Sequence, residues 1–247
     1  MLLLSFFSPS NEISSYIRVD TISQLLTSAN IYSSSRVLVA ENTQGMIISS
    51  LLSRVTDGLV FGLFEGGGAN YDILKISNFT ESLEKKVFHS LSWQKIDHQI
   101  EPFTEELGEN HTENDVKGRD RRLRNHNALK ETLETLRSAP FDSLVVSTSY
   151  DPLSVIKKLV PYVGGSRAVV IYSPYKETLL ESFEYMRMSS EFLNVSLQES
   201  WMREYQVLPG RTHPMMNMTS SGGYLLTAIR VFASNEPRQT PSKKSRS

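Results

Sequence analysis

A glycine-poor turn follows the first strongly apolar run of the sequence, and its residue types decide what it can bind. The run at 37–40 leads into Glu41, Asn42, Thr43, Gln44 and Gly45. A turn that holds a cofactor after a buried strand uses glycines, because they let the backbone approach the ligand closely. This turn has one glycine, Gly45, and the side chains of Asn42, Thr43 and Gln44 would crowd such a ligand. The turn is therefore predicted to be unfit for cofactor binding.

Two carboxylates lie at or near the ends of later apolar runs. Glu65 follows Leu59–Phe64, a position from which an acidic side chain can bind ribose hydroxyls, although a solvated side chain is the ordinary alternative. Asp151 comes several residues after Leu144–Val146, too late for a general base, which must lie within hydrogen-bond reach of its substrate. Because Pro152 follows it, Asp151 is predicted to cap a helix instead.

The densest group of basic side chains lies in residues 101–137, a segment with few apolar residues that is predicted to be a charged insertion. Five contacts between these side chains and RNA phosphates would give a log–log salt slope of roughly −4 to −5. The alternative is a solvated charge run, neutralised by the acidic residues just upstream. The RNA-binding candidates in this segment are Lys117, Arg119, Arg121, Arg122 and Arg124.

A second candidate surface lies in a polar loop near the end of the chain. Arg211 has the donor geometry for a phosphate and His213 has a ring that stacks on a base, with a structural role for His213 as the alternative. Methionine and aromatic residues nearby predict a subunit interface, where both types are enriched. Packing in the core is the alternative for the tryptophan. The interface candidates are Trp201, Met215, Met216 and Met218.

Composition excludes several classes of protein. The chain has no cysteine and five scattered histidines, which excludes disulfide frameworks, cysteine nucleophiles and a metal-ligand spacing. Its formal net charge is −1, so nucleic-acid binding requires a local basic patch. No run reaches the roughly 20 apolar residues needed to cross a bilayer, which predicts that no membrane is involved.

Buried strands that alternate with helices must position these residues. Helical spacing of apolar residues follows each of the apolar runs at 36–40, 59–64, 144–146 and 168–172. This order predicts a parallel, doubly wound sheet. Residues 193–197 and 222–229 are predicted to pair antiparallel, because no long helix separates them. Such a mostly parallel sheet ending in an antiparallel hairpin is the layout of an α/β, Rossmann-like class I methyltransferase fold.

One domain is predicted over residues 16–233, between an N-terminal extension at 1–15 and a disordered tail at 234–247. The domain opens with a helix, because Thr21 and Gln24 have the spacing of a capping box and Ile22, Leu25 and Leu26 recur on one face. This helix precedes the first predicted strand.

Several motifs make the chain resemble a known family, the non-catalytic subunit of the eukaryotic tRNA (adenine-N1-)-methyltransferase, of Gcd10 type. The likeness extends from about residue 16 to residue 231. It is carried by Arg18–Leu26, Ser173–Glu181, Glu199–Tyr205, Gln206–Pro214 and Gly222–Leu226.

The resemblance implies that the chain is not itself an enzyme and serves as the tRNA-binding subunit of a complex that methylates adenine 58 of the tRNA T-loop. It implies a heterotetramer with catalytic subunits, a nuclear location, and S-adenosylmethionine bound by the catalytic subunit only. Glu65 and Gly45 are then remnants of a cofactor site. The alternative is an active S-adenosylmethionine-dependent RNA methyltransferase with a degenerate cofactor loop. The family also carries an N-terminal β-barrel domain, of which residues 1–15 would be a remnant or a substitute.

Overall fold

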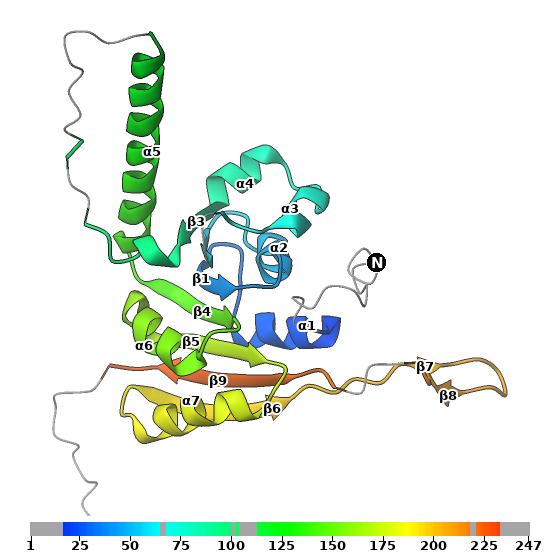
Figure 1. Cartoon of the computed structure of the whole chain (residues 1–247). Coiled ribbons are helices and arrows are strands. Elements are labelled where there is room, and N and C mark those ends of the chain that lie inside the picture. Colours follow the sequence, from blue (N-terminus) through cyan, green and yellow to red (C-terminus); the bar gives the residue numbers. More distant parts are fainter. Residues whose placement is uncertain (1–16, 65–67, 100–101, 104–112, 218–220, 233–247) are drawn as a thin grey trace, which may run out of the picture.

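The computed structural model describes residues 17–64, 68–99, 102–103, 113–217 and 221–232. They form a seven-stranded sheet in the order β3-β2-β1-β4-β5-β9-β6, with helices on both faces, and a separate two-stranded ribbon (Figure 1). The predicted N-terminal extension and C-terminal tail lie outside the described residues.

Five parallel strands form the centre and one side of the sheet. β1 lies between β2 and β4, and β3 and β5 extend the sheet outward. β1, β2 and β4 are buried along nearly their whole length, which explains their continuous apolar runs. The strands predicted from the sequence are confirmed, and β3 was not predicted. Their bounds are β1 Arg36–Glu41, β2 Leu59–Phe64, β3 Phe88–Ser92, β4 Phe141–Ser147 and β5 Val163–Ser173.

Two antiparallel strands complete the sheet. β9 (Tyr224–Arg230) lies between β5 and β6 (Phe192–Glu199) and runs antiparallel to both. The predicted antiparallel pairing of these two segments is confirmed.

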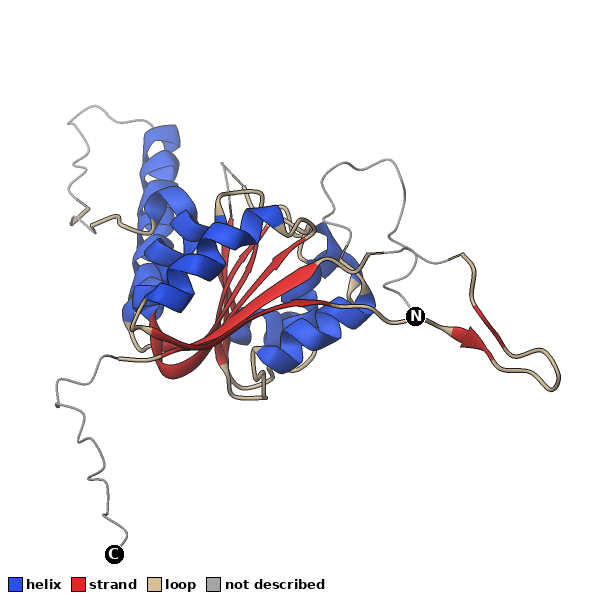
Figure 2. Cartoon of the chain, turned by 90° about the horizontal axis from the view of Figure 1, so that it is seen from below, coloured by secondary structure: helices blue, strands red, loops and turns tan. Residues whose placement is uncertain are grey.

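Helices on the two faces of the sheet bury two apolar clusters (Figure 2). One face packs against α1, α2 and α3, where Leu25 and Ile47 are buried. The other packs against α6, α7 and the end of α5, around Ile156 and Leu136. The sheet is thus the middle of three layers. The bounds are α1 Val19–Ser28, α2 Met46–Leu52, α3 Asp72–Ile76, α4 Glu81–Val87, α5 Glu113–Arg137, α6 Pro152–Leu159 and α7 Glu177–Met188, with short 3₁₀ turns at Trp93–Lys95 and Val160–Tyr162.

The start of α1 differs from the predicted capping box. The helix begins at Val19, after Arg18, and no side chain caps its first turn. Thr21 lies inside the helix and is fully buried, and its hydroxyl donates to the carbonyl oxygen of Gly222 at 2.7 Å. The predicted box of Thr21 and Gln24 was wrong, because the threonine hydroxyl has a partner far away in the sequence.

Asp151 caps α6, as predicted. Its carboxylate accepts hydrogen bonds from Ser154 N at 2.9 Å and from Leu153 N at 3.4 Å, and Pro152 is the first helical residue. The Ser154 hydroxyl donates to the same carboxylate at 2.6 Å. This bond is the main reason why the pKa of Asp151 lies below its usual value.

Replacing Asp151 by alanine is expected to lower the free energy of unfolding by about 1 kcal/mol, the usual cost of losing an N-cap acceptor. Asp151→Asn keeps an acceptor for the Ser154 N–H and is expected to lose less. Urea denaturation of the two variants and the parent measures this difference. An alanine variant as stable as the parent would contradict the capping role.

A long helix occupies most of the segment that was predicted to be a charged insertion. The last turns of α5 pack into the core, where Leu133 and Leu136 are buried and Arg137 donates to the carbonyl oxygen of His98 at 3.0 Å. The first half of α5 projects away from the sheet (Figure 1). The helix was missed from the sequence because its charged residues outnumber the apolar residues that mark a helical face.

A second projection leaves the domain between β6 and β9, and its residues Trp201–Asn217 are termed the arm. The strands β7 (Tyr205–Gln206) and β8 (His213–Pro214) form a short antiparallel ribbon within it that extends well beyond the sheet (Figure 2). Tyr224 pairs with the last residues of both β5 and β6. The arm therefore leaves from the edge at which the parallel strands end.

Candidate functional site

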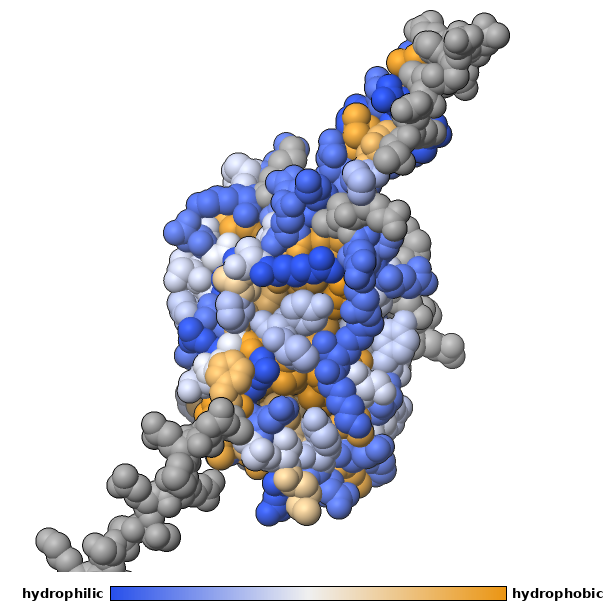
Figure 3. All heavy atoms as spheres, turned by 90° about the vertical axis from the view of Figure 1, so that its left-hand side faces the viewer, coloured by the Kyte–Doolittle hydropathy of each residue, from blue (hydrophilic) through white to orange (hydrophobic). Residues whose placement is uncertain are grey.

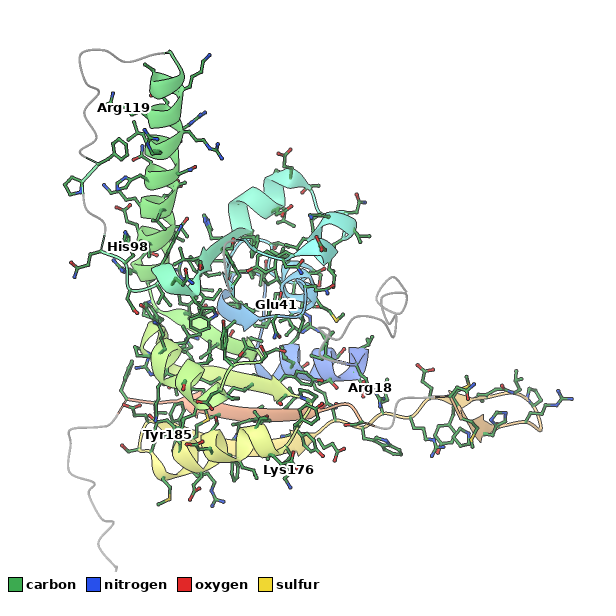
Figure 4. The ribbon with its side chains drawn as sticks, viewed as in Figure 1. Arg18, Glu41, His98, Arg119, Lys176 and Tyr185 are labelled. Carbon is green, nitrogen blue, oxygen red and sulfur yellow. The ribbon has the colours of Figure 1, made fainter. Side chains whose placement is uncertain are left out.

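The turn after β1 is filled by a carboxylate of the same chain. Glu41, the last residue of β1, is 6% exposed, and its Oε2 accepts hydrogen bonds from Ile47 N at 3.1 Å and from the Thr43 hydroxyl (Figure 4). Its Oε1 has no hydrogen-bond partner among the described residues. Burial raises the pKa of Glu41 to about 7, against the opposing effect of these hydrogen bonds. A protein side chain thus occupies the start of α2, where folds of this topology bring a ligand.

The single glycine of the turn is covered by the segment after β2. Gly45 has a left-handed backbone, with a φ of 90°, and immediately precedes α2. A Cβ on Gly45 would lie 3.2 Å from the Cα of Tyr71 and 3.6 Å from Leu74. The carbonyl oxygen of Gln44 accepts a hydrogen bond from Ile73 N at 3.2 Å. The glycine therefore makes room for the protein's own chain.

Tyr71 fills the space beside this glycine. Its ring meets Phe88 edge-on with a centroid distance of 5.5 Å, and Phe64 at 6.3 Å. A Cβ on Gly62 of β2 would lie 2.8 Å from the Tyr71 hydroxyl oxygen. Burial, and then the nearby charge of Glu41, raise the pKa of Tyr71, whose hydroxyl has no hydrogen-bond partner among the described residues. Tyr71 and Glu41 together fill the first turn of the fold.

Asn42 bridges the crevice between β1 and β4. The strand order reverses between these two strands, and ligands of open α/β sheets bind at such a point. The Asn42 N–H donates to the carbonyl oxygen of Ser147 at 3.0 Å. In the orientation that satisfies its amide, the Asn42 side chain donates to that same oxygen at 3.0 Å and accepts from Ser149 Oγ at 3.0 Å. The crevice is closed by hydrogen bonds between its two sides.

The residues at these strand ends do not fit S-adenosylmethionine, the cofactor suggested by the fold. A buried carboxylate, a covered glycine and a bridged crevice take up the space at the ends of β1 and β4. Glu65, the predicted ribose-binding remnant, lies outside the described residues. Gly45, the other predicted remnant, is in contact with Tyr71.

The basic residues predicted to bind RNA lie on two sides of α5. Lys117, Arg121 and Arg124 lie three and four residues apart, so they share one face, and all three are exposed. These three are termed the basic stripe, and they span about 10 Å along the helix. Arg119, labelled in Figure 4, is half-buried. Arg122 is exposed, and because it lies three residues after Arg119, the two share another side of the helix. The side of the molecule seen in Figure 3 is mainly hydrophilic, including much of the projecting helix.

The arm holds the other two residues predicted to bind RNA. Arg211 lies in the turn between β7 and β8, where its N–H donates to the carbonyl oxygen of Leu208 at 3.0 Å, and its side chain is exposed. His213 is also exposed, and its Nδ1 lies 3.0 Å from the carbonyl oxygen of Pro214. Figure 1 and Figure 2 place the arm and α5 at opposite ends of the molecule. The RNA-binding candidates therefore form two separate groups.

The predicted interface residues that the structure describes lie on the arm. The exposed fraction is 61% for Trp201, 40% for Met215 and 78% for Met216, so Trp201 is not a core residue. Met218 lies outside the described residues. Val207, 75% exposed, adds to this surface and was not predicted. Exposed apolar side chains gathered on one ribbon are typical of a protein-binding surface.

Two residues that shape the filled turn were missed from the sequence. Tyr71 approaches Gly45 only in the folded chain, and no motif connects the two positions. Glu41 was predicted only to lie in the turn. Its signal was its place directly after four apolar residues, which puts it within the buried strand.

In the part of the chain that the structure describes, the helices are too short or too polar to traverse a lipid bilayer. The same residues contain no cluster of three or more acidic or histidine side chains that could hold a metal ion.

Solved structures with the same topology define the class of the fold. An S-adenosylmethionine-dependent O-methyltransferase from Thermotoga maritima superposes with a TM-score of 0.62 at 14% identity, over 90% of this chain and 69% of that chain. The tRNA (m1A58) methyltransferase TrmI from Aquifex aeolicus gives a TM-score of 0.60 at 14% identity, over 89% of this chain and 72% of that chain. The chain has the class I methyltransferase fold, as predicted.

The sequence relatives of the chain point to one family among proteins with this fold. The chain is 30% identical to a protein of Dictyostelium discoideum, over 87% of this chain and 46% of that protein, and 28% identical to one of Debaryomyces hansenii, over 86% and 46%. Both are named tRNA (adenine(58)-N(1))-methyltransferase non-catalytic subunit, as is a mouse protein that is 25% identical, over 93% and 58%. The chain spans about half the length of these curated relatives.

The sequence profile of the Gcd10p family matches residues 6–127. The resemblance to the Gcd10p family that was inferred from the motifs is confirmed.

Proposed function

We propose that this chain is the non-catalytic, tRNA-binding subunit of a tRNA (adenine-N1-)-methyltransferase complex that modifies adenine 58, in which a catalytic partner binds S-adenosylmethionine. The observation that carries the proposal is the filled turn after β1, where Glu41, Asn42 and Tyr71 take up the space of a cofactor. A subunit without a cofactor site contributes to the reaction by binding. The names of the relatives from Dictyostelium discoideum and Debaryomyces hansenii support the same role.

The basic stripe on α5 is the surface that we propose for tRNA. Its three exposed cations stand on a helix half that projects away from the domain, within reach of a large ligand (Figure 1). Side chains three or four residues apart on a helix are about 5 to 6 Å apart at their Cβ atoms, so neighbouring cations of the stripe can contact different phosphates. With a net charge of −1 for the whole chain, binding to RNA depends on such a local concentration of positive charge.

The arm is the surface that we propose for the catalytic partner. Association would bury its exposed apolar side chains, which are Trp201, Val207, Met215 and Met216. Aromatic residues and methionine are enriched at the centres of interfaces. A heterotetramer and a nuclear location, both implied by the family resemblance, belong to the same proposal. Size-exclusion chromatography with light scattering tests the first, and microscopy of the tagged protein tests the second.

Calorimetric titration of S-adenosylmethionine is expected to give heat of binding with the mixture of this chain and its catalytic partner, and none with this chain alone. The comparison separates a non-catalytic subunit from the alternative, an active methyltransferase with a degenerate cofactor loop. Micromolar binding to the isolated chain that is lost in Glu65→Ala would overturn the proposal and favour that alternative. Glu181→Ala, at an exposed position of α7, serves as the control.

A further inference from the structure

The chain that enters the arm is held by the first turn of α1. Arg18 is only 8% exposed, and its Nε donates to Asp20 Oδ1 at 2.9 Å. Its Nη2 donates to the main-chain carbonyl oxygen of Met202, the second residue of the arm. A buried guanidinium that bonds a backbone carbonyl holds the main chain at that point, because the guanidinium would be costly to leave without this partner. Figure 4 shows Arg18 at the end of α1 nearest to the arm.

The chain that returns from the arm is held by the same turn of α1. The Thr21 hydroxyl donates its one proton to the carbonyl oxygen of Gly222 at 2.7 Å. In its hydrogen bond with the Ser200 hydroxyl, Thr21 is therefore the acceptor and Ser200 the donor. Thr21 and Ser200 are 0% and 1% exposed. A Cβ on Gly222 would lie 2.4 Å from the Ser200 carbonyl oxygen, so only glycine allows the two chains to meet here. Gly223, with a φ of 75°, then turns the chain into β9.

The arm has little internal structure to set its own direction. Its two strands contain two residues each, joined to each other and not to the large sheet. An isolated two-stranded ribbon is marginally stable in water. Its orientation relative to the domain is therefore decided by the contacts at its base.

We propose that Arg18 and Thr21 are positioning residues for the arm, and that the clamp they form with Ser200, Met202 and Gly222 fixes the direction in which the arm leaves the domain. Holding the arm in one direction before association reduces the conformational entropy lost on binding. The effect on partner binding rests on the proposed function of the arm, whereas the positioning itself is a property of the isolated chain.

Distances between two spin labels on the full chain test the clamp directly. The chain has no cysteine, so Thr212→Cys on the arm and Glu181→Cys on α7 give two unique labelling sites at exposed positions. Double electron–electron resonance is expected to give one narrow distance distribution for this pair. Adding Arg18→Ala is expected to at least double the width of the distribution. Ser53→Ala is the matched control, because it removes an exposed hydrogen bond at the end of α2, to Ser50, away from the arm.

Ser200→Ala provides a milder test, because it removes the hydrogen bond to Thr21 and leaves Arg18 in place. Its distribution is expected to broaden while its near-ultraviolet circular dichroism matches the parent. If Arg18→Ala does not fold, the width measured for Ser200→Ala decides. Distributions as narrow as the parent in every folded clamp variant would overturn the proposal.

Affinity for the catalytic partner provides a second and separate readout. Variants with a broadened distribution are expected to bind the partner at least tenfold more weakly. Broadened distances with unchanged partner affinity would support the clamp and contradict the assignment of the arm as the partner surface. The distance measurement therefore tests the clamp, and the affinity measurement tests the arm as the partner surface.

Discussion

Replacing Lys117, Arg121 and Arg124 together by glutamine is expected to weaken tRNA binding about a hundredfold at physiological salt. Each phosphate contact contributes about 0.7 to 0.9 to the salt slope and about a factor of five in affinity near 0.15 M salt. Three lost contacts should therefore reduce the slope by roughly 2 to 3. Filter binding of tRNA to the complex over a series of salt concentrations measures both quantities.

A second triple variant distinguishes the effect of losing the basic stripe from the effect of lowering the net charge. Lys75, Lys86 and Arg187 are also exposed, on α3, α4 and α7, and their replacement by glutamine changes the net charge equally. This control is expected to change the affinity less than threefold, since it touches none of the residues assigned to RNA. Equal losses in the two triple variants would contradict the assignment of the basic stripe.

Glu41→Gln is expected to remove a pH dependence of stability that the parent chain shows between about pH 4.5 and 7. Burial raises the pKa of the folded carboxyl from 4.5 to about 7, so folding takes up a proton in this range. Stability from this group is fully present below the unfolded pKa and is lost as the pH rises to the folded pKa. A tenfold change in proton affinity is worth about 1.4 kcal/mol, so the total effect is roughly 3 kcal/mol.

The difference in unfolding free energy between the parent and Glu41→Gln isolates this group from the other carboxylates. The parent is expected to lose roughly 3 kcal/mol relative to the variant between pH 4.5 and pH 8. Glu184→Gln, at an exposed position of α7, is the matched control and is expected to show a much smaller change. A difference that stays constant with pH would show that Glu41 is not buried as a titrating carboxyl.

The strands of the fold were predictable because burial on both faces gives continuous apolar runs. Leu59–Phe64 was predicted with its observed bounds. β3 was missed because His89, Ser90 and Ser92 interrupt its apolar residues, and its outer edge is free of strand pairing among the described residues. Asp151 was assigned correctly because a cap depends on neighbouring residues, whereas the buried contacts of Thr21 depend on a distant one.

The filled turn was only partly predictable. Its lack of glycines follows from the sequence, and so does the conclusion that it is unfit for a cofactor. The side chains that fill it do not follow from the sequence, because Tyr71, just before α3, and Ser149, after β4, reach it from distant segments. The burial of Glu41 also depends on these neighbours. Two of the family motifs, Arg18–Leu26 and Gly222–Leu226, meet at the base of the arm and not at the turn.

The place where the arm leaves the sheet determines which edge of the domain a subunit bound to the arm would lie beside. The arm departs from the edge where β5 and β6 end, the same edge onto which the bridged crevice between β1 and β4 opens. In an active enzyme of this class, that edge must stay open for substrates to enter and products to leave. If the chain is non-catalytic, as proposed, no substrate has to pass this edge, and a neighbouring subunit can cover it permanently without obstructing a reaction.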